Sequence, residues 1–242
     1  MNATLVFDAV LLTLIPFVIG LLFLLKQDFL QAKSKWLYPF VAGVILFLFI
    51  DSFKDSASLG GDSRVSEGII IFIPFVILML AMPAWKEISK SAAGLASILL
   101  LALSLHTAGE SAEIVVLLQT ATTSQLFSNY IPGFVGFAGH KMIEGFVAAF
   151  LLAGLKTSRR DKLLIPLFII VATSATGAIV ALLTLFSSVY FFAAGAAGDL
   201  FILAYIFEKG RNILDLQSFW LYLFMLAGFT LIYFLGYLHS IA

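Results

Sequence analysis

Two stretches of the sequence read SLHTAGESAEI (residues 104–114) and FAGHKMIEGF (residues 137–146). Each contains a histidine followed four residues later by a glutamate: His106 and Glu110 in the first, His140 and Glu144 in the second. Residues four apart lie on the same face of a helix, so each stretch is expected to present one imidazole beside one carboxylate. The surrounding residues are strongly apolar. Ionisable groups in a membrane are costly and usually face a partner, a cavity or a substrate.

The composition is that of a membrane protein with many spans. The chain has 242 residues, of which 62% are hydrophobic and only 12% charged, and its mean hydropathy is +1.08. Soluble domains are closer to half apolar and a quarter charged. The formal net charge is zero, which gives no indication of a nucleic-acid partner. The absence of cysteine excludes disulfides and thiolate metal ligands.

Apolar segments long enough to cross a bilayer, about 18 residues or more, fill the chain from end to end. The sequence therefore predicts an all-α, polytopic membrane protein whose residues 1–242 form a single transmembrane domain embedded in the lipid bilayer. Eight spans are expected, at about residues 4–25, 36–53, 68–85, 92–118, 131–155, 163–186, 189–207 and 217–240. The least distinct boundary is Ser187–Ser188, where two polar residues separate the sixth span from the seventh.

The basic residues predict the orientation. With the N-terminus outside, only Lys54 and Arg64 fall in outer loops, whereas the inner loops contain Lys26, Lys33, Lys35, Lys86, Lys90, Lys156, Arg159, Arg160, Lys162, Lys209 and Arg211. Cytoplasmic loops carry such an excess, and it is maintained throughout only if the number of spans is even. We therefore expect a multi-pass protein of the cell membrane with both termini outside. This topology places both His/Glu pairs near the bilayer midplane.

Two imidazoles and two carboxylates at one depth favour a divalent transition metal. Imidazole suits zinc, iron, copper or nickel, and carboxylates extend the range to manganese. Glu113, one turn beyond Glu110, and Asp199, inside the seventh span, are further candidate metal ligands. Glu113 could instead line the approach to the site. The alternative for the whole set is a buried polar network that holds helices together.

These motifs resemble those of the ZIP (Zrt-, Irt-like) divalent metal transporters. HTAGES, beginning at His106, is similar to the HNxPEG motif of that family, and HKMIEG, beginning at His140, is similar to its HExPxG-type motif. FVAGV (residues 40–44) and FFAAGA (residues 191–196) extend the resemblance. It implies a 3+2+3 bundle in which spans one to three and six to eight are inverted repeats around spans four and five. It also implies that His106, Glu110, His140 and Glu144 form the primary metal site.

The chain departs from the family pattern at several positions. Thr107 stands where the family has asparagine, and Lys141 where it has a carboxylate, so the adjacent second metal site is expected to be lost. Gly109 and Ile143 replace the two motif prolines. An ammonium at this depth needs a partner. We expect Lys141 to reach a carboxylate such as Glu110, Glu113 or Asp199, or else to extend toward the outer surface.

The function predicted from the sequence is membrane transport of a divalent metal, zinc first and iron or manganese next, by alternating access. The metal is the transported substrate; no prosthetic group and no enzymatic activity are expected. Because neutral imidazoles bind metal and protonated ones do not, transport should weaken in acid. A membrane-embedded metal-dependent hydrolase and a proton-coupled carrier of a small solute are the alternatives, and a homodimer is left open.

Overall fold

The computed structural model describes residues 3–60, 76, 91–120, 131–183, 189–211 and 218–240. Within these ranges it contains helices and no strand. The elements are α1 (Ala3–Leu21), η1 (Leu22–Lys26), α2 (Gln27–Ala32), α3 (Ser34–Gly60), α5 (Ala92–Thr120), α7 (Ile131–Ala153), α8 (Arg159–Leu183), α9 (Val189–Gly210) and α10 (Phe219–Ser240).

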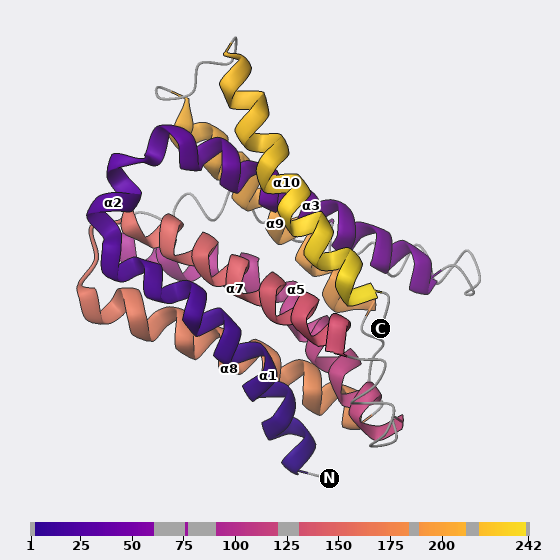
Figure 1. Cartoon of the computed structure of the whole chain (residues 1–242). Helices are drawn as coiled ribbons and strands as arrows, with labels where there is room; N and C mark the ends of the chain where they lie inside the picture. The colour runs from indigo at the N-terminus through magenta and orange to yellow at the C-terminus, as the bar shows by residue number, and fades with distance from the viewer. Residues whose placement is uncertain are drawn as a thin grey trace.

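Seven helical segments in the described ranges are long and apolar enough to cross a membrane, when α1, η1 and α2 are taken as one segment of 30 residues. The expectation of an all-helical, multi-pass integral membrane protein is therefore confirmed. The third expected span, residues 68–85, lies outside the described residues, so the total of eight remains a prediction. α3 and α5, which precede and follow it, run in the same direction (Figure 1).

The sixth and seventh expected spans are separate helices. α8 ends at Leu183 and α9 begins at Val189, and the boundary expected at Ser187–Ser188 falls between them, outside the described residues. The two helices also have different neighbours, since α8 packs on α5 and α1, whereas α9 packs on α3 and α5.

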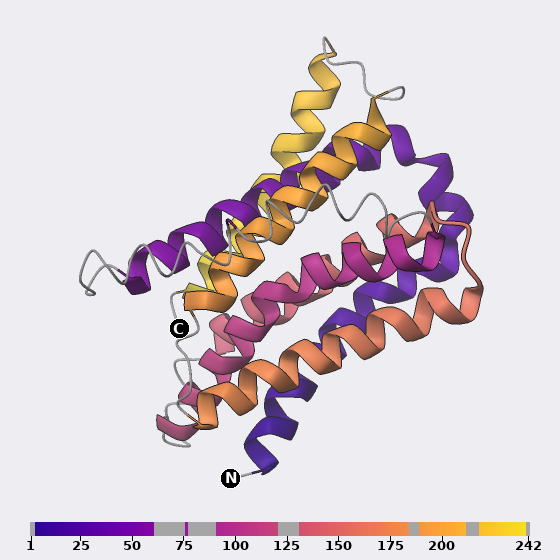
Figure 2. The same cartoon turned by 180° about the vertical axis from the view of Figure 1, so that it is seen from behind.

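The two helices that carry the His/Glu pairs are central to the bundle, as opposite views show (Figures 1 and 2). α5 packs closely on α8 and α9, and α7 packs closely on α1 and α10. The backbones of α5 and α7 approach each other over a much shorter stretch. Long side chains from both helices therefore meet between them.

Glycines allow this close packing of the outer helices on α5 and α7. A Cβ on Gly145 of α7 would collide with the carbonyl oxygen of Phe17 in α1, and a Cβ on Gly177 of α8 would collide with that of Ala108 in α5. Small residues at such positions let helix backbones approach. Two other glycines near the His/Glu pairs meet side chains instead: Gly109 faces the Phe192 ring and Gly139 the Leu235 side chain.

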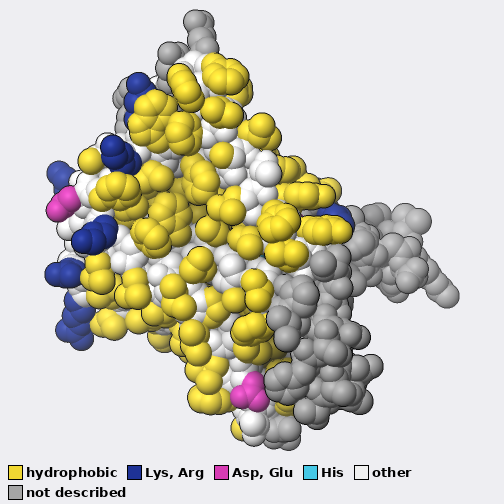
Figure 3. All heavy atoms as spheres, in the orientation of Figure 1, with side chains coloured by type: hydrophobic (Ala, Val, Ile, Leu, Met, Phe, Trp, Pro, Cys, Tyr) yellow, Lys and Arg dark blue, Asp and Glu magenta, His cyan; other side chains and the backbone are white. Residues whose placement is uncertain are grey.

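The molecular surface has an apolar belt and one basic end. Large hydrophobic side chains are exposed on the lateral surface, among them Phe168 at 75% and Phe234 at 56%, as expected for contact with lipid tails (Figure 3). Lysines and arginines gather at the end of the bundle formed by α2 and the connection from α7 to α8. The N-terminal end of α1 and the C-terminal end of α10 both lie at the opposite end of the bundle. The basic residues thus gather at one end of the bundle, and the side of the membrane that this end faces stays a prediction.

Candidate metal site between α5 and α7

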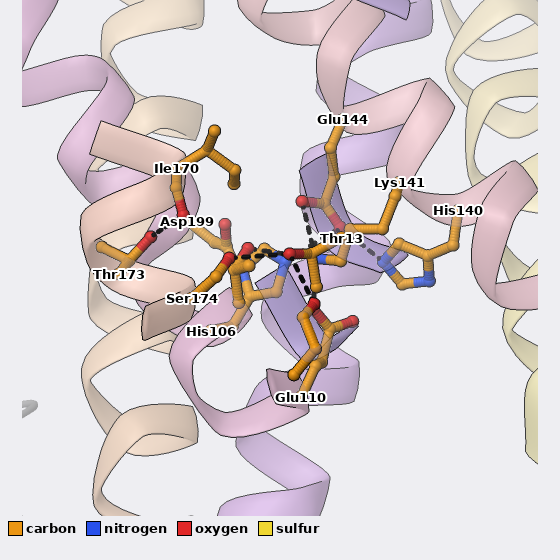
Figure 4. Close-up of polar contacts among 12 residues, drawn as sticks. Thr13, His106, Glu110, His140, Lys141, Glu144, Ile170, Thr173, Ser174 and Asp199 are labelled. Atoms are coloured by element: carbon orange, nitrogen blue, oxygen red, sulfur yellow. Dashed lines mark hydrogen bonds and ion pairs between the residues drawn. The ribbon is translucent and has the colours of Figure 1, made fainter. Parts of the chain in front are cut away.

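The structure brings the two His/Glu pairs together. One potential ligand atom from each of the four side chains lies within 4.8 Å of the others: His106 and Glu110 from α5, His140 and Glu144 from α7. All four residues are buried, with exposed fractions of 8% or less. Figure 4 shows the side chains converging from the two helices. The sequence spacing permitted this convergence, and the structure shows it; a metal bound by the four residues stays a prediction.

The site lies halfway along both helices. His106 is the central residue of α5, which runs from Ala92 to Thr120. The centre of α7 falls at Met142, between His140 and Glu144. Since both helices are long enough to span a bilayer, the expected position near the midplane follows from where they begin and end.

Both imidazoles direct Nε2 to the same carboxylate oxygen. Oε1 of Glu144 lies 3.1 Å from Nε2 of His106 and 3.0 Å from Nε2 of His140. Tetrahedral zinc with ligands at 2.0–2.1 Å requires ligand atoms about 3.4 Å apart, and both nitrogen–oxygen distances are close to that value. Although both contacts are short, neither Nε2 has hydrogen-bond geometry to any described residue. Two buried nitrogen atoms thus meet at one carboxylate oxygen, and the three atoms would define a shared coordination point for an ion.

Lys141 occupies the space between the two carboxylates. Its Nζ lies 2.7 and 2.9 Å from the two carboxylate oxygens of Glu144 and 3.0 Å from Oγ1 of Thr107, and it forms an ion pair with Glu110. The side chain is fully buried. The alternative that Lys141 extends toward the outer surface is therefore wrong. An unpaired lysine at the bilayer centre costs about 2.5–3.5 kcal/mol or more, so pairing with Glu110 and Glu144 favours the inward orientation.

Asp199 lies on the other side of His106 and does not belong to the group of four. Its Oδ2 is 3.9 Å from Nδ1 of His106, beyond hydrogen-bond range. It is fully buried, and neither carboxylate oxygen has a hydrogen-bond partner among the described residues. Asp199 reaches this position because α9 approaches α5 at two glycines: Gly195 lies against Cβ of His106, and Gly198 against the backbone of Ala102. Its expected role as a metal ligand stays a prediction.

Glu113 lies toward the end of α5, where it is exposed and also outside the group of four. Its charge interacts with those of Asp51 and Asp55 on α3, and Asp55 is also close enough to interact with Glu110. Carboxylates thus extend from the end of the bundle away from the basic residues inward to the site. This position fits the role of lining the approach better than that of a ligand.

Two polar contacts near the site were not predicted from the sequence. Thr107, noted only for its departure from a motif, accepts a hydrogen bond from Lys141. It lies three residues before Glu110, so shared helical facing was a signal for this role. The second contact joins α8 to α1, where Oγ of Ser174 lies 2.8 Å from Oγ1 of Thr13 (Figure 4).

Comparison with family models, with curated proteins and with solved structures finds no match for this chain. Its chemistry is therefore argued from the site itself. Two imidazole nitrogens and two carboxylate oxygens, contributed by two helices, form a donor set suited to zinc, iron or manganese. The site has enough ligands to replace most of the water around such an ion.

Proposed function

We propose that this protein transports a divalent transition metal across the membrane, zinc first and iron or manganese next, through the site between α5 and α7. The observation that carries the proposal is the convergence of four buried ligand groups within 4.8 Å at the middle of two membrane-spanning helices. Intramembrane ionisable groups that converge in this way usually mark an ion pathway.

The packing of the site supports transport over permanent storage of an ion. α5 packs mainly on α8 and α9, and α7 mainly on α1 and α10, while α8 also contacts α1; the ligands lie where α5 and α7 face each other. A movement of one group against the other exposes the site alternately to the two membrane surfaces, which is how alternating access works in inverted-repeat transporters. The carboxylates of Asp51, Asp55 and Glu113 provide an electrostatic attraction for cations at one end.

The resemblance to ZIP transporters is part of the proposal. The symmetry of a 3+2+3 inverted repeat relates the first span (α1) to the sixth (α8), and the fourth span (α5) to the fifth (α7). The contact between α5 and α8 is therefore equivalent to the contact between α7 and α1. Both pairs of helices pack closely. Eight spans, termini outside and location in the cell membrane complete the proposed architecture.

Metal transport, metal-dependent hydrolysis and proton-coupled transport of a solute predict different results when metal flux is measured. A hydrolase needs an open metal position and a general base. Glu113, which could serve as that base, lies outside the group of four. A proton-coupled carrier of a small solute would use the same His/Glu groups to move protons, without net metal uptake. Metal flux therefore separates transport from both.

The test is uptake of Zn²⁺, Fe²⁺ and Mn²⁺ into liposomes containing the purified protein. His106→Ala and Glu144→Ala should abolish uptake, because each removes a ligand from the shared coordination point. Glu208→Ala is the matched control, since this glutamate is exposed near the end of α9 and lies outside the site. Uptake at the wild-type rate in both site variants, or no metal uptake by the wild type, would refute the proposal.

A further inference from the structure

The ammonium group of Lys141 has as many polar partners as it has N–H donors. An ammonium has three N–H donors, and Nζ of Lys141 has three partners: Thr107 and Glu110 on α5, and Glu144 on α7. Its exposed fraction is 0%. A side chain with four flexible carbons is thus held in one place by contacts to two helices. Because each of its three N–H donors has a partner, the ammonium is an integral part of the site.

The ammonium and a metal ion would use the same oxygen atoms. Oε1 of Glu144 lies 2.7 Å from Nζ of Lys141, and it is also the atom to which both histidines direct Nε2. Glu110, the other carboxylate in the group of four, is paired with Lys141 as well. A metal that binds all four ligands must therefore displace the ammonium from at least one oxygen of each carboxylate.

We propose that Lys141 is a tethered counter-ion, which neutralises the carboxylates when no metal is bound and so enables the empty site to return between its two access states. This inference rests on the proposed transport function. A transporter that releases its cargo must reorient with an empty site before it can bind again. Buried carboxylates without a cation oppose that step, because charge in the membrane interior is costly.

A covalently attached cation removes this obstacle without help from solution. The ammonium reaches both carboxylates from α7, so the electrostatic connection between α5 and α7 persists when the metal leaves. When a metal returns, the ammonium retains Thr107 as a hydrogen-bond acceptor, and the ring of Phe137 lies 5.9 Å from Nζ. The empty protein can thus complete its cycle without carrying a second metal or a proton back.

The alternative role of Lys141 is purely structural, as an ion pair that holds two helices together. The two roles differ in which transport mode they affect. Net uptake requires the empty site to reorient, whereas exchange of labelled metal against metal inside the vesicle proceeds with the site loaded in both directions. A counter-ion affects net uptake selectively, and a structural pair affects both modes alike.

The experiment measures both modes in liposomes containing wild type, Lys141→Met or Lys141→Arg. Methionine has a similar length without the charge, and arginine is the matched control because it retains the charge. We expect the ratio of net Zn²⁺ uptake to Zn²⁺ exchange to fall at least about tenfold in Lys141→Met, as for an uncompensated carboxylate at the bilayer centre. Lys141→Arg should retain more of the wild-type ratio than Lys141→Met does. An unchanged ratio in Lys141→Met would overturn the inference.

Calorimetric titration of the detergent-solubilised proteins with Zn²⁺ gives an independent reading. Without its internal competitor, Lys141→Met should bind Zn²⁺ more tightly than wild type, and equal or weaker binding would contradict the shared use of the carboxylates. If Lys141→Met shows no thermal unfolding transition, Lys141→Gln replaces it in both measurements. If the wild type both exchanges and accumulates metal, but Lys141→Met has the same ratio of net uptake to exchange as the wild type, this inference alone is refuted. A wild type inactive in both modes refutes transport, and this inference with it.

Discussion

Gly195 of α9 lies directly against His106 of α5, and a Cβ added to the glycine would come within 2.6 Å of Cβ of the histidine. The backbone nitrogen and Cα of His106 would both lie 2.9 Å away. This glycine therefore determines how closely α9 can pack beside the metal site. The position of His106 thus depends on a residue that cannot itself bind a metal.

Replacing Gly195 by alanine should displace α9 from α5 and disturb His106. Overpacking of this kind typically costs about 1–3 kcal/mol, so the variant should unfold at a lower temperature and bind Zn²⁺ more weakly. Thermal unfolding with and without Zn²⁺ measures both effects. Gly154→Ala is the control, because its added Cβ would meet nothing closer than the Leu151 carbonyl oxygen at 4.0 Å. Equal behaviour of the two variants would contradict the close packing.

Asp199 should act on the site through His106. Its carboxylate faces Nδ1 of His106, whereas Nε2 faces the coordination point. Across 3.9 Å the carboxylate acts on the imidazole through its charge, and losing a carboxylate behind a metal-binding histidine typically costs about 10–100-fold in metal affinity. We expect such a loss in Asp199→Asn, measured by calorimetric titration, with Glu208→Gln unchanged. An unchanged affinity would exclude this role.

The wild-type chain should bind one metal ion at the midplane, because the ammonium of Lys141 fills the space between Glu110 and Glu144. Changing Lys141 to glutamate and Thr107 to asparagine replaces that cation with oxygen and amide ligands. The double variant should bind a second, weaker ion, detectable by elemental analysis of purified protein. Lys35→Glu is the control, since this lysine is exposed near the start of α3, at the other end of that helix from Asp51 and Asp55. Two ions in the wild type would contradict the prediction.

The orientation can be tested with single cysteines, because the chain contains none. Cysteines in place of Thr4 and Lys54 should react with a membrane-impermeant reagent added to intact cells. Cysteines in place of Ser158 and Lys209, both at the basic end, should react only after permeabilisation. The reverse labelling pattern would show that the basic end faces outward.

The sequence predicted the helices and the pairing of His with Glu on one face of each of two helices, because both depend on local rules. Length and apolarity predict spans, and the interval from His106 to Glu110 predicts a shared helical face. The depth of the site followed from counting residues along α5 and α7. These inferences need no knowledge of how one helix is rotated against another.

The same rules could not determine what surrounds the ligands. Whether Lys141 turns toward Glu110 or toward the surface depends on the rotation of α7, which its contact with α1 at Gly145 helps to fix. Asp199 is ninety-three residues from His106 in the sequence, and only the packing of Gly195 and Gly198 on α5 brings the two together. Such relationships arise from tertiary packing, which helical periodicity does not encode.

The central position of His106 in α5 has an electrical consequence. In the proposed transport cycle, a cation held there has crossed about half of the membrane, so about half of the transmembrane voltage acts on its arrival and the other half on its release. For a divalent ion this amounts to about 2.3 kcal/mol per 100 mV in each stage, since one full elementary charge corresponds to that energy. A negative cell interior would assist both stages equally. Because the ammonium of Lys141 is never released in the proposed cycle, we expect the voltage to act on the loaded half of it.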